Sequence, residues 1–415
     1  MKSLANTSAF AFRDFRFYWF MRLCNTLAIQ MLSVAIGWQV YDVARQTRSV
    51  EESAFLLGMI GLAQFLPLFL LTLIAGYAAD RLDRRWIGRA AIALEITGVA
   101  LLLVESLSAS VSLPVVFVVA AMLGVARALA APAFQALAPN LVSKEVLPSA
   151  IALSSLAWQG ASVGGPALGG YIYVAGPSAA YAACLGLLVL SLGFAFLIRP
   201  VPRPPVSALS PWQSVKEGLA YVRTNRVVFG AVTLDLFAVL LGGATALLPV
   251  FARDVLHVGP EGLGHLRAAP AAGAVVIAML LAVRPLRRHM GLVMFWSVAA
   301  FGMLTALFGL STNFGVSLGL LAMLGAVDMV SVYVRQSIVQ IFVPDTMRGR
   351  VASVSTLCIS ASNELGEFES GVAARFLGAV GAVVFGGVGA VSITALWAWR
   401  FPELRRTDRL DSPPA

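Results

Sequence analysis

Three carboxylates, Glu364, Glu367 and Glu369, lie in an apolar stretch near the end of the chain. On a helix, Glu364 and Glu367 would share one face, whereas Glu369 would point elsewhere. Burial and neighbouring negative charges favour the protonated carboxyl, so one of these groups could take up and release a proton near neutral pH. The cluster therefore predicts proton-transfer chemistry inside an apolar environment.

Two other interpretations of this acidic cluster stay open. The acids could pair with Arg127, Arg335 or Arg375 and only fix the packing of helices. Alternatively, the helix could break at the acids, which would then line an aqueous vestibule.

Further polar side chains lie within apolar stretches. An ion near the centre of a bilayer costs at least about 2–3 kcal/mol unless it is paired or hydrated, so each is a candidate functional group. Glu95, Arg127 and Asp235 are candidates for proton coupling, beside Glu364 and Glu367. The candidates for a substrate cavity are Asn25, Gln30, Gln159, Phe237, Asp328, Arg335 and Asn363. For the uncharged residues, ordinary packing is the alternative.

The composition places the chain in a membrane. Of its 415 residues, 59% are hydrophobic and only 12% are charged, whereas a soluble domain carries about 25% charged residues. The net charge of +9 would suit nucleic acid, but the charges cluster between apolar segments, so no nucleic-acid partner is expected. Cys24, Cys184 and Cys358 lie inside apolar segments without metal-ligand spacing, and we expect neither a metal nor another cofactor.

Twelve apolar segments each approach the ~20 residues that a helix needs to cross a bilayer. They predict an all-α membrane protein with transmembrane helices at residues 17–41, 54–78, 86–105, 112–135, 146–172, 178–198, 227–251, 265–283, 290–310, 314–342, 350–377 and 379–400. If both termini are cytoplasmic, most basic residues lie on the cytoplasmic side, and the other side holds only Arg45, Arg48, Arg253, Arg267 and Arg375. This positive-inside bias predicts that orientation.

The longest polar connection divides the helices into two sets of six. We expect an N-terminal half at residues 1–199, a cytoplasmic linker at 200–226, a C-terminal half at 227–402 and a cytoplasmic tail at 403–415. Within the linker, residues 212–223 predict an amphipathic helix on the membrane surface. Segments 135–140 and 340–345 resemble each other. Two related, pseudo-symmetric halves around a central site are typical of a transporter.

The loop between the second and third spans carries a charged motif, Gly76-Tyr-Ala-Ala-Asp80-Arg81-Leu-Asp83-Arg84-Arg85. It resembles the corresponding loop of the major facilitator superfamily, except that Asp83 stands where the family usually has glycine. The resemblance implies a cytoplasmic gate in which Asp80 latches onto the start of the eleventh span, where a helix N-terminus attracts a carboxylate. The alternative is a basic loop that only sets the topology.

The fifth span contains a second motif, Ala161-Ser-Val-Gly164-Gly165-Pro166-Ala-Leu-Gly169-Gly170. It resembles the antiporter motif of the same superfamily, with Ala161 in place of the first glycine. The resemblance implies export in exchange for protons, with Gly165, Pro166, Gly169 and Gly170 allowing helix motion. Ordinary packing of small residues is the alternative.

The resemblance covers essentially the whole chain and points to a bacterial exporter branch that includes the enterobactin exporter and related drug or secretion-effector proteins. It implies the major facilitator fold, a multi-pass protein of the bacterial inner membrane, and a monomer. It also implies that Arg127 acts with Glu364 or Glu367 to couple protons to cargo.

The leading hypothesis is a proton-coupled exporter that works by alternating access on a medium-sized amphipathic compound, such as a siderophore or a drug. Its partners would be this small molecule, protons and the lipid bilayer. The alternatives are an importer or facilitator of a small metabolite, and a lipid flippase. An enzyme is not expected, because His257, His265 and His289 are far apart in sequence and no nucleotide loop or nucleophile motif is present.

Overall fold

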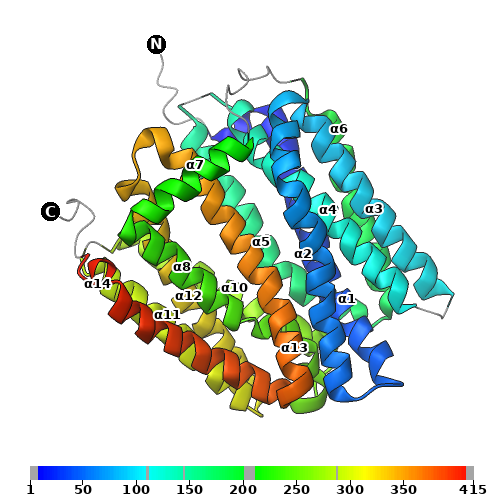
Figure 1. Cartoon of the computed structure of the whole chain (residues 1–415). Helices are drawn as coiled ribbons and strands as arrows, with labels where there is room; N and C mark the ends of the chain where they lie inside the picture. The colour runs from blue at the N-terminus through cyan, green and yellow to red at the C-terminus, as the bar shows by residue number, and fades with distance from the viewer. Residues whose placement is uncertain (1–7, 109–111, 144, 201–210, 287, 408–415) are drawn as a thin grey trace. The chain divides into compact units, whose positions relative to one another are not determined.

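The chain is built from helices (Figure 1). The computed structural model describes residues 8–108, 112–143, 145–200, 211–286 and 288–407. Within these ranges it contains no β-strand. Residues 201–210 of the predicted linker and 408–415 of the predicted tail lie outside the described residues.

The helices follow one another with short connections. Their bounds are α1 (Arg13–Arg45), α2 (Val50–Arg81), α3 (Arg84–Leu107), α4 (Leu113–Leu137), α5 (Leu147–Tyr173), α6 (Pro177–Leu197), α7 (Pro211–Thr224), α8 (Arg226–Leu241), α9 (Leu248–Val250), α10 (Pro260–Val283), α11 (Met290–Leu310), α12 (Phe314–Phe342), α13 (Asp345–Arg400) and α14 (Pro402–Arg405). A π-helix at Phe251–Val255 follows α9.

Ten of the described helices are long and apolar enough to cross a membrane. The fifth predicted span is α5, which brings the number to eleven; it has the required length but carries serine, glutamine and glycine residues that lower its mean hydropathy. The twelfth arises because α13 contains two predicted spans. The all-α fold with twelve membrane helices is therefore confirmed in outline.

Gly378 divides α13 into two segments. Its backbone has φ 72° and ψ 165°, values that lie outside the helical region. Only glycine adopts this region readily. The break falls between the predicted spans 350–377 and 379–400. After it, the chain packs along α11, where Gly302 and Gly387 lie in backbone contact.

Local sequence explains where several helices begin. Asn225 precedes α8, and its side-chain oxygen accepts hydrogen bonds from the backbone N–H groups of Val227 and Val228 at 3.2 and 3.1 Å. Asn313 caps α12 through the N–H of Val316 at 3.1 Å. Such caps satisfy donors that the first helical turn leaves unpaired.

The chain forms two compact units. Unit 1 comprises residues 1–43, 63–211 and 259–268, and unit 2 comprises residues 44–62, 212–258 and 269–415. In unit 1, α3 packs against α4 and α6 (Figure 1). Two aromatic residues at the start of α1 form hydrogen bonds with neighbouring helices. The buried Tyr18 donates its hydroxyl to the Phe134 carbonyl at 3.0 Å, and the partly buried Trp19 donates its indole N–H to the Leu153 carbonyl at 2.8 Å.

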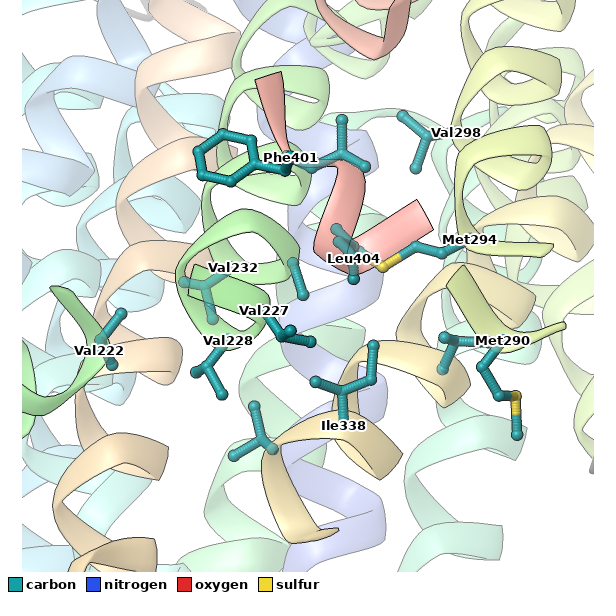
Figure 2. Close-up of a cluster of buried hydrophobic side chains, with 14 of the residues drawn as sticks. Val222, Val227, Val228, Val232, Met290, Met294, Val298, Ile338, Phe401 and Leu404 are labelled. Carbon is teal, nitrogen blue, oxygen red and sulfur yellow. The ribbon is translucent and has the colours of Figure 1, made fainter. Parts of the chain in front are cut away.

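Unit 2 has an apolar core formed by residues of α7, α8, α11, α12, α13 and α14. Figure 2 shows part of it, where Leu404 of α14 lies between Phe401 and Met294. Leu404 and Met290 are fully buried. This core fixes the start of α11 against α14.

The predicted amphipathic helix is present as α7, but part of its apolar face packs on protein. Val222 is buried in the core of unit 2, and the Tyr221 hydroxyl donates to the Phe342 carbonyl at 3.0 Å. Glu217 forms an ion pair with Arg350. The Trp212 side chain is 65% exposed and is accessible for contact with the membrane surface.

The break at Gly378 generates a stability prediction. Gly378→Ala should lower the free energy of unfolding by about 1–3 kcal/mol, because alanine is strained at this backbone conformation. An added methyl group would meet no other atom within 4 Å there, so the cost comes from the backbone alone. Thermal unfolding of the detergent-solubilised protein measures it.

Gly319 of α12 provides the matched control, because a methyl group there also meets no atom within 4 Å but the backbone is helical. Gly319→Ala should be neutral or slightly stabilising. Equal stability of the two variants would contradict the proposed strain.

Candidate functional site

The charged loop between α2 and α3 joins helix ends within unit 1. Arg84 donates to the Ala136 carbonyl at the end of α4 at 3.1 Å, and Arg85 donates to the Ile198 carbonyl at the end of α6 at 3.2 Å. Carbonyl groups at helix C-termini lack helical partners and attract cations. The two arginines therefore tie the ends of three helices together.

Arg89 adds to this arrangement and was missed by the sequence analysis as a site residue. It is 7% exposed, donates to the Ala195 carbonyl at 3.3 and 3.0 Å, and lies over the Trp86 and Phe196 rings. Its position four residues after Arg85, on the same helix face, is the signal that could have identified it.

The predicted latch itself is only partly described. Asp80 is in the last turn of α2, and its side chain lies outside the described residues. Arg81 is exposed at the end of the same helix. A methyl group on Gly76 would meet no described atom within 4 Å.

Asp83, the departure from the family pattern, is the N-cap of α3. Its carboxylate accepts from the Arg85 backbone N–H at 3.0 Å and forms an ion pair with the Arg85 guanidinium at 2.6 Å. Glycine is also a favourable N-cap, which explains how two different residues can serve at this position. The hydrogen bonds from Arg85 hold the pKa of Asp83 below its ordinary value.

Glu95 and Asn25 form a buried polar pair between α3 and α1. The Asn25 amide donates to a Glu95 carboxylate oxygen at 2.6 Å. Glu95 is 2% exposed and Asn25 is 8% exposed. Among the described residues no cationic side chain forms an ion pair with Glu95. Sequence analysis gave these residues separate roles, in proton coupling and in a substrate cavity.

Asp235 and Arg335 form a buried ion pair between α8 and α12 in unit 2, with side chains 7% and 4% exposed. The two residues were predicted separately, for proton coupling and for a substrate cavity. Arg335 thus has a partner other than the acids of α13. Asp328, seven residues earlier on α12, is partly buried, and no hydrogen bond to it is found within the described chain.

The acidic cluster lies on an unbroken helix, so the idea of a break at the acids is wrong. Glu364 is buried, and Glu367 and Glu369 are partly buried. Glu367 packs against the first half of α2, since a methyl group on Gly61 would come within 2.9 Å of its Cβ.

We call this contact the α2–α13 seam, formed by Gly58, Gly61, Glu367 and Gly371 within unit 2. A methyl group on Gly58 would come within 2.7 Å of Gly371 Cα, so the two backbones touch. Beyond the seam, the Arg375 guanidinium lies 5.0 Å from the centroid of the Phe55 ring of α2.

The glycines of the second motif bring α5 against two other segments of unit 1. A methyl group on Gly169 would come within 2.8 Å of Met31 Cα on α1, and Gly165 lies against Gln30. Gly170 and Pro166 contact the start of α10. We call this second contact the α5–α10 seam. Beside it, the Tyr171 hydroxyl and His265 Nε2 are 3.1 Å apart.

The remaining predicted residues are distributed over both units. Arg127 is exposed on α4, Gln159 is partly buried on α5, and Asn363 is exposed on α13. The Phe237 ring packs at 5.3 Å from Trp397. Within the described ranges, no three His, Cys, Asp or Glu side chains could together hold a metal ion.

The N-cap at Asp83 generates a prediction on stability and pH. Asp83→Ala should lower the free energy of unfolding by about 1 kcal/mol. Because the folded pKa of Asp83 is depressed, its contribution should be present above about pH 4 and lost as the pH falls through the folded pKa. Thermal unfolding as a function of pH measures both effects.

Asp83→Asn is the matched control, because asparagine keeps the cap and removes the charge. It should lose less stability than the alanine variant and show no contribution from titration at this position. Identical pH profiles for wild type and Asp83→Asn would contradict the role of the ion pair.

The buried pair of Asp235 and Arg335 generates a second prediction. Arg335→Met should destabilise the protein by about 3–5 kcal/mol, because it leaves a buried charge without a partner. The double variant Asp235→Asn with Arg335→Met should recover much of this loss. A double variant that is no more stable than Arg335→Met would show that the charge pairing is not the cause. Thermal unfolding in detergent compares the wild type with both variants.

Comparison with known proteins gives a consistent assignment. The chain matches the family described as transmembrane secretion effector over residues 5–415. It is 26% identical over 381 residues to the enterobactin exporter EntS of Shigella boydii serotype 18, covering 91% of this chain and 85% of that protein.

Solved structures share the fold. A POT family transporter in complex with 5-aminolevulinic acid has a TM-score of 0.73 at 12% identity, covering 95% of this chain and 97% of that chain. A D-xylose-proton symporter has a TM-score of 0.71 at 14% identity, covering 93% and 98%. The chain therefore belongs to the transmembrane secretion effector family of the major facilitator superfamily, and it is a multi-pass secondary transporter rather than an enzyme.

Proposed function

We propose that this transporter exports a medium-sized amphipathic compound, such as a siderophore or a lipophilic drug, in exchange for protons. The likeness to an enterobactin exporter along 91% of the chain carries the proposal. The cell would be bacterial, the protein would lie in the inner membrane as a monomer, and both termini would be cytoplasmic. The positive-inside bias of the loops supports this orientation.

The pair of Glu95 and Asn25 supports the coupling to protons. Glu95 is buried, with 2% of its surface exposed, and its hydrogen-bond partner is the amide of Asn25. An amide can donate to a charged carboxylate through its NH₂ group and accept from a neutral carboxyl through its oxygen. Glu95 could therefore change protonation without leaving an unpaired cation behind.

The other predicted acids differ in this respect. Protonation of Asp235 would leave Arg335 charged and buried, which is costly, so we assign that pair to the stability of unit 2. Glu364 and Glu367 remain candidates, because they lie at or beside the α2–α13 seam. Arg127, exposed on α4, would face water and act with one of these acids.

The two glycine seams support alternating access. Both consist of backbone contacts of glycines, which depend on close packing. We propose that the α2–α13 and α5–α10 seams open and close during transport, while Arg84, Arg85 and Arg89 keep α3, α4 and α6 together. Asp80 would act as the latch of the cytoplasmic gate.

Transport in liposomes tests this proposal. The purified protein is reconstituted, a labelled catecholate siderophore or lipophilic cation is added, and a pH gradient is imposed. We expect the gradient to drive accumulation of the compound in the wild type. Glu95→Gln should keep downhill movement and lose most of the gradient dependence, because glutamine cannot exchange a proton. Glu364→Gln is measured in parallel.

Glu105→Gln is the control, because Glu105 is on the same helix but accepts from Ser112 at the exposed end. It should behave like the wild type. Full gradient dependence in both Glu95→Gln and Glu364→Gln would rule out these proton sites. A wild type that moves the compound without any effect of the gradient would indicate a facilitator or a flippase.

A further inference from the structure

Asp328 is the central residue of α12 and has no partner in the described part of the chain. The helix runs from Phe314 to Phe342, so this carboxylate lies equally far from both helix ends. Neither a hydrogen bond nor an ion pair to Asp328 is present among the described residues. An ionisable side chain at this depth of a membrane span is costly unless it is paired or hydrated. The export mechanism proposed above gives it no role.

The surface of α12 shows which way Asp328 faces. The exposed large apolar residues of this helix include Val316, Met323 and Ile341, which lie together on one side of it. Arg335 is seven residues after Asp328 and therefore on the same face. It is 4% exposed and forms its ion pair with α8. Asp328 thus lies on the protein side of α12 and not on the side suited to lipid.

Asp328 remains accessible on that side. It is only partly buried, and the row that continues from it in steps of four residues includes Gln336 and Gln340, which are both exposed. Exposed amide side chains within a membrane helix are expected beside water, not beside hydrocarbon. An accessible row with polar residues therefore leads from the C-terminal end of α12 to the carboxylate.

Ser331 is a second unsatisfied group at this level of α12. It is 2% exposed, and its hydroxyl has no hydrogen-bond partner within the described chain. Buried polar atoms are nearly always paired. Residues three apart on a helix have Cβ atoms about 5–6 Å apart, so one small group could contact both Ser331 and Asp328. Two such acceptors side by side indicate a ligand that donates hydrogen bonds.

The internal repeat places a charge at the corresponding position of unit 1. In unit 2, a methyl group on Gly325 would overlap a backbone carbonyl of α10, and Asp328 follows three residues later. In unit 1, a methyl group on Gly124 of α4 would overlap a backbone carbonyl of α2, and Arg127 follows three residues later. Arg127 is exposed. The repeat therefore supports an accessible charge, and not a packing residue, at this helix position.

The charge balance around Asp328 favours a cationic ligand. Arg335 and Asp235 neutralise each other, so an ionised Asp328 adds a net negative charge to this face. A metal ion is poorly suited, because Ca²⁺ and Mg²⁺ take about six oxygen ligands, and no three His, Cys, Asp or Glu side chains of the described ranges could together hold one. An ammonium group needs fewer acceptors and has up to three N–H donors.

We propose that Asp328 and Ser331 bind a protonated amine of the transported compound. The carboxylate accepts one N–H and neutralises the charge, and the hydroxyl oxygen accepts a second N–H. A lipid head group is an unsuitable occupant, because head groups lie at the level of the helix ends whereas Asp328 is at the midpoint of α12. This assignment rests on the proposed function, and it narrows the cargo to a cationic amphipathic compound.

Equilibrium binding to the purified protein in a non-ionic detergent tests the proposal without any pH gradient. Three fluorescent probes differ in one group: 2-(1-naphthyl)ethylamine, its trimethylammonium derivative and 2-(1-naphthyl)ethanol. The wild type should bind both cations more tightly than the alcohol. Equal affinity for the amine and the alcohol would overturn the proposal.

Asp328→Asn tests the role of the charge. It should weaken the binding of both cations by about 10- to 100-fold, because the hydrogen-bonded charge is lost, and it should change the binding of the alcohol little. Asp328→Glu keeps the charge and should retain part of the affinity. Because Asp328 leaves no partner behind, Asp328→Asn should unfold at or above the wild-type temperature, which separates lost binding from lost folding.

Ser331→Ala separates hydrogen bonding from charge. It should weaken the binding of the primary amine about fivefold and leave the trimethylammonium probe unaffected, because that ion has no N–H to donate. Ser337→Ala is the matched control on the same helix, because the Ser337 hydroxyl already donates to the Tyr333 carbonyl at 2.8 Å. It should bind all three probes like the wild type. Equal losses in the two serine variants would contradict the proposed site.

These results can be told apart from a failure of proton exchange. Amine binding that depends on Asp328, in a protein whose transport ignores the pH gradient, would support the amine site and contradict the proposed antiport. Unchanged amine binding in Asp328→Asn would overturn the amine site. If that variant also lost gradient-driven transport, Asp328 would be a proton site instead.

Discussion

The cost of a polar group without a partner in hydrocarbon governs this structure. Lipid offers no hydrogen bonds, so every polar side chain that enters a span must find its partner within the protein or in a water-filled space. Three buried groups of the described chain meet this requirement in different ways. Asp235 pairs with a guanidinium, Glu95 pairs with an amide, and Arg89 donates to a backbone carbonyl and lies over two aromatic rings.

These partners differ in what they allow. An ion pair such as Asp235 with Arg335 fixes both charges, because the loss of either leaves the other buried alone. An amide partner accepts either protonation state of a carboxyl. Glycine seams bring helix backbones into close contact, and we propose that these contacts open and close during transport. The same constraint thus separates residues that stabilise each unit from residues and contacts that can change during transport.

Sequence predicted the helices well because apolar length and glycine positions are local signals. The boundary between the spans 350–377 and 379–400 and the helix at α7 followed from such signals. Partners could not be predicted, because they are distant in sequence. Asn25 meets Glu95, and Asp235 meets Arg335, only after the helices pack. The capping role of Asp83 depends on backbone geometry and was also missed.

The exchange of protons for cargo is the central claim, and a zero-flux measurement in proteoliposomes tests it most directly. The gradient of a labelled compound is held fixed while the pH gradient is varied until net movement of the compound stops. The account predicts that movement stops at a non-zero pH gradient in which the side with more compound is also the side with more protons, so that the two driving forces on the exchange cancel. Net movement that vanishes only when the compound gradient itself is zero, whatever the pH gradient, would contradict it.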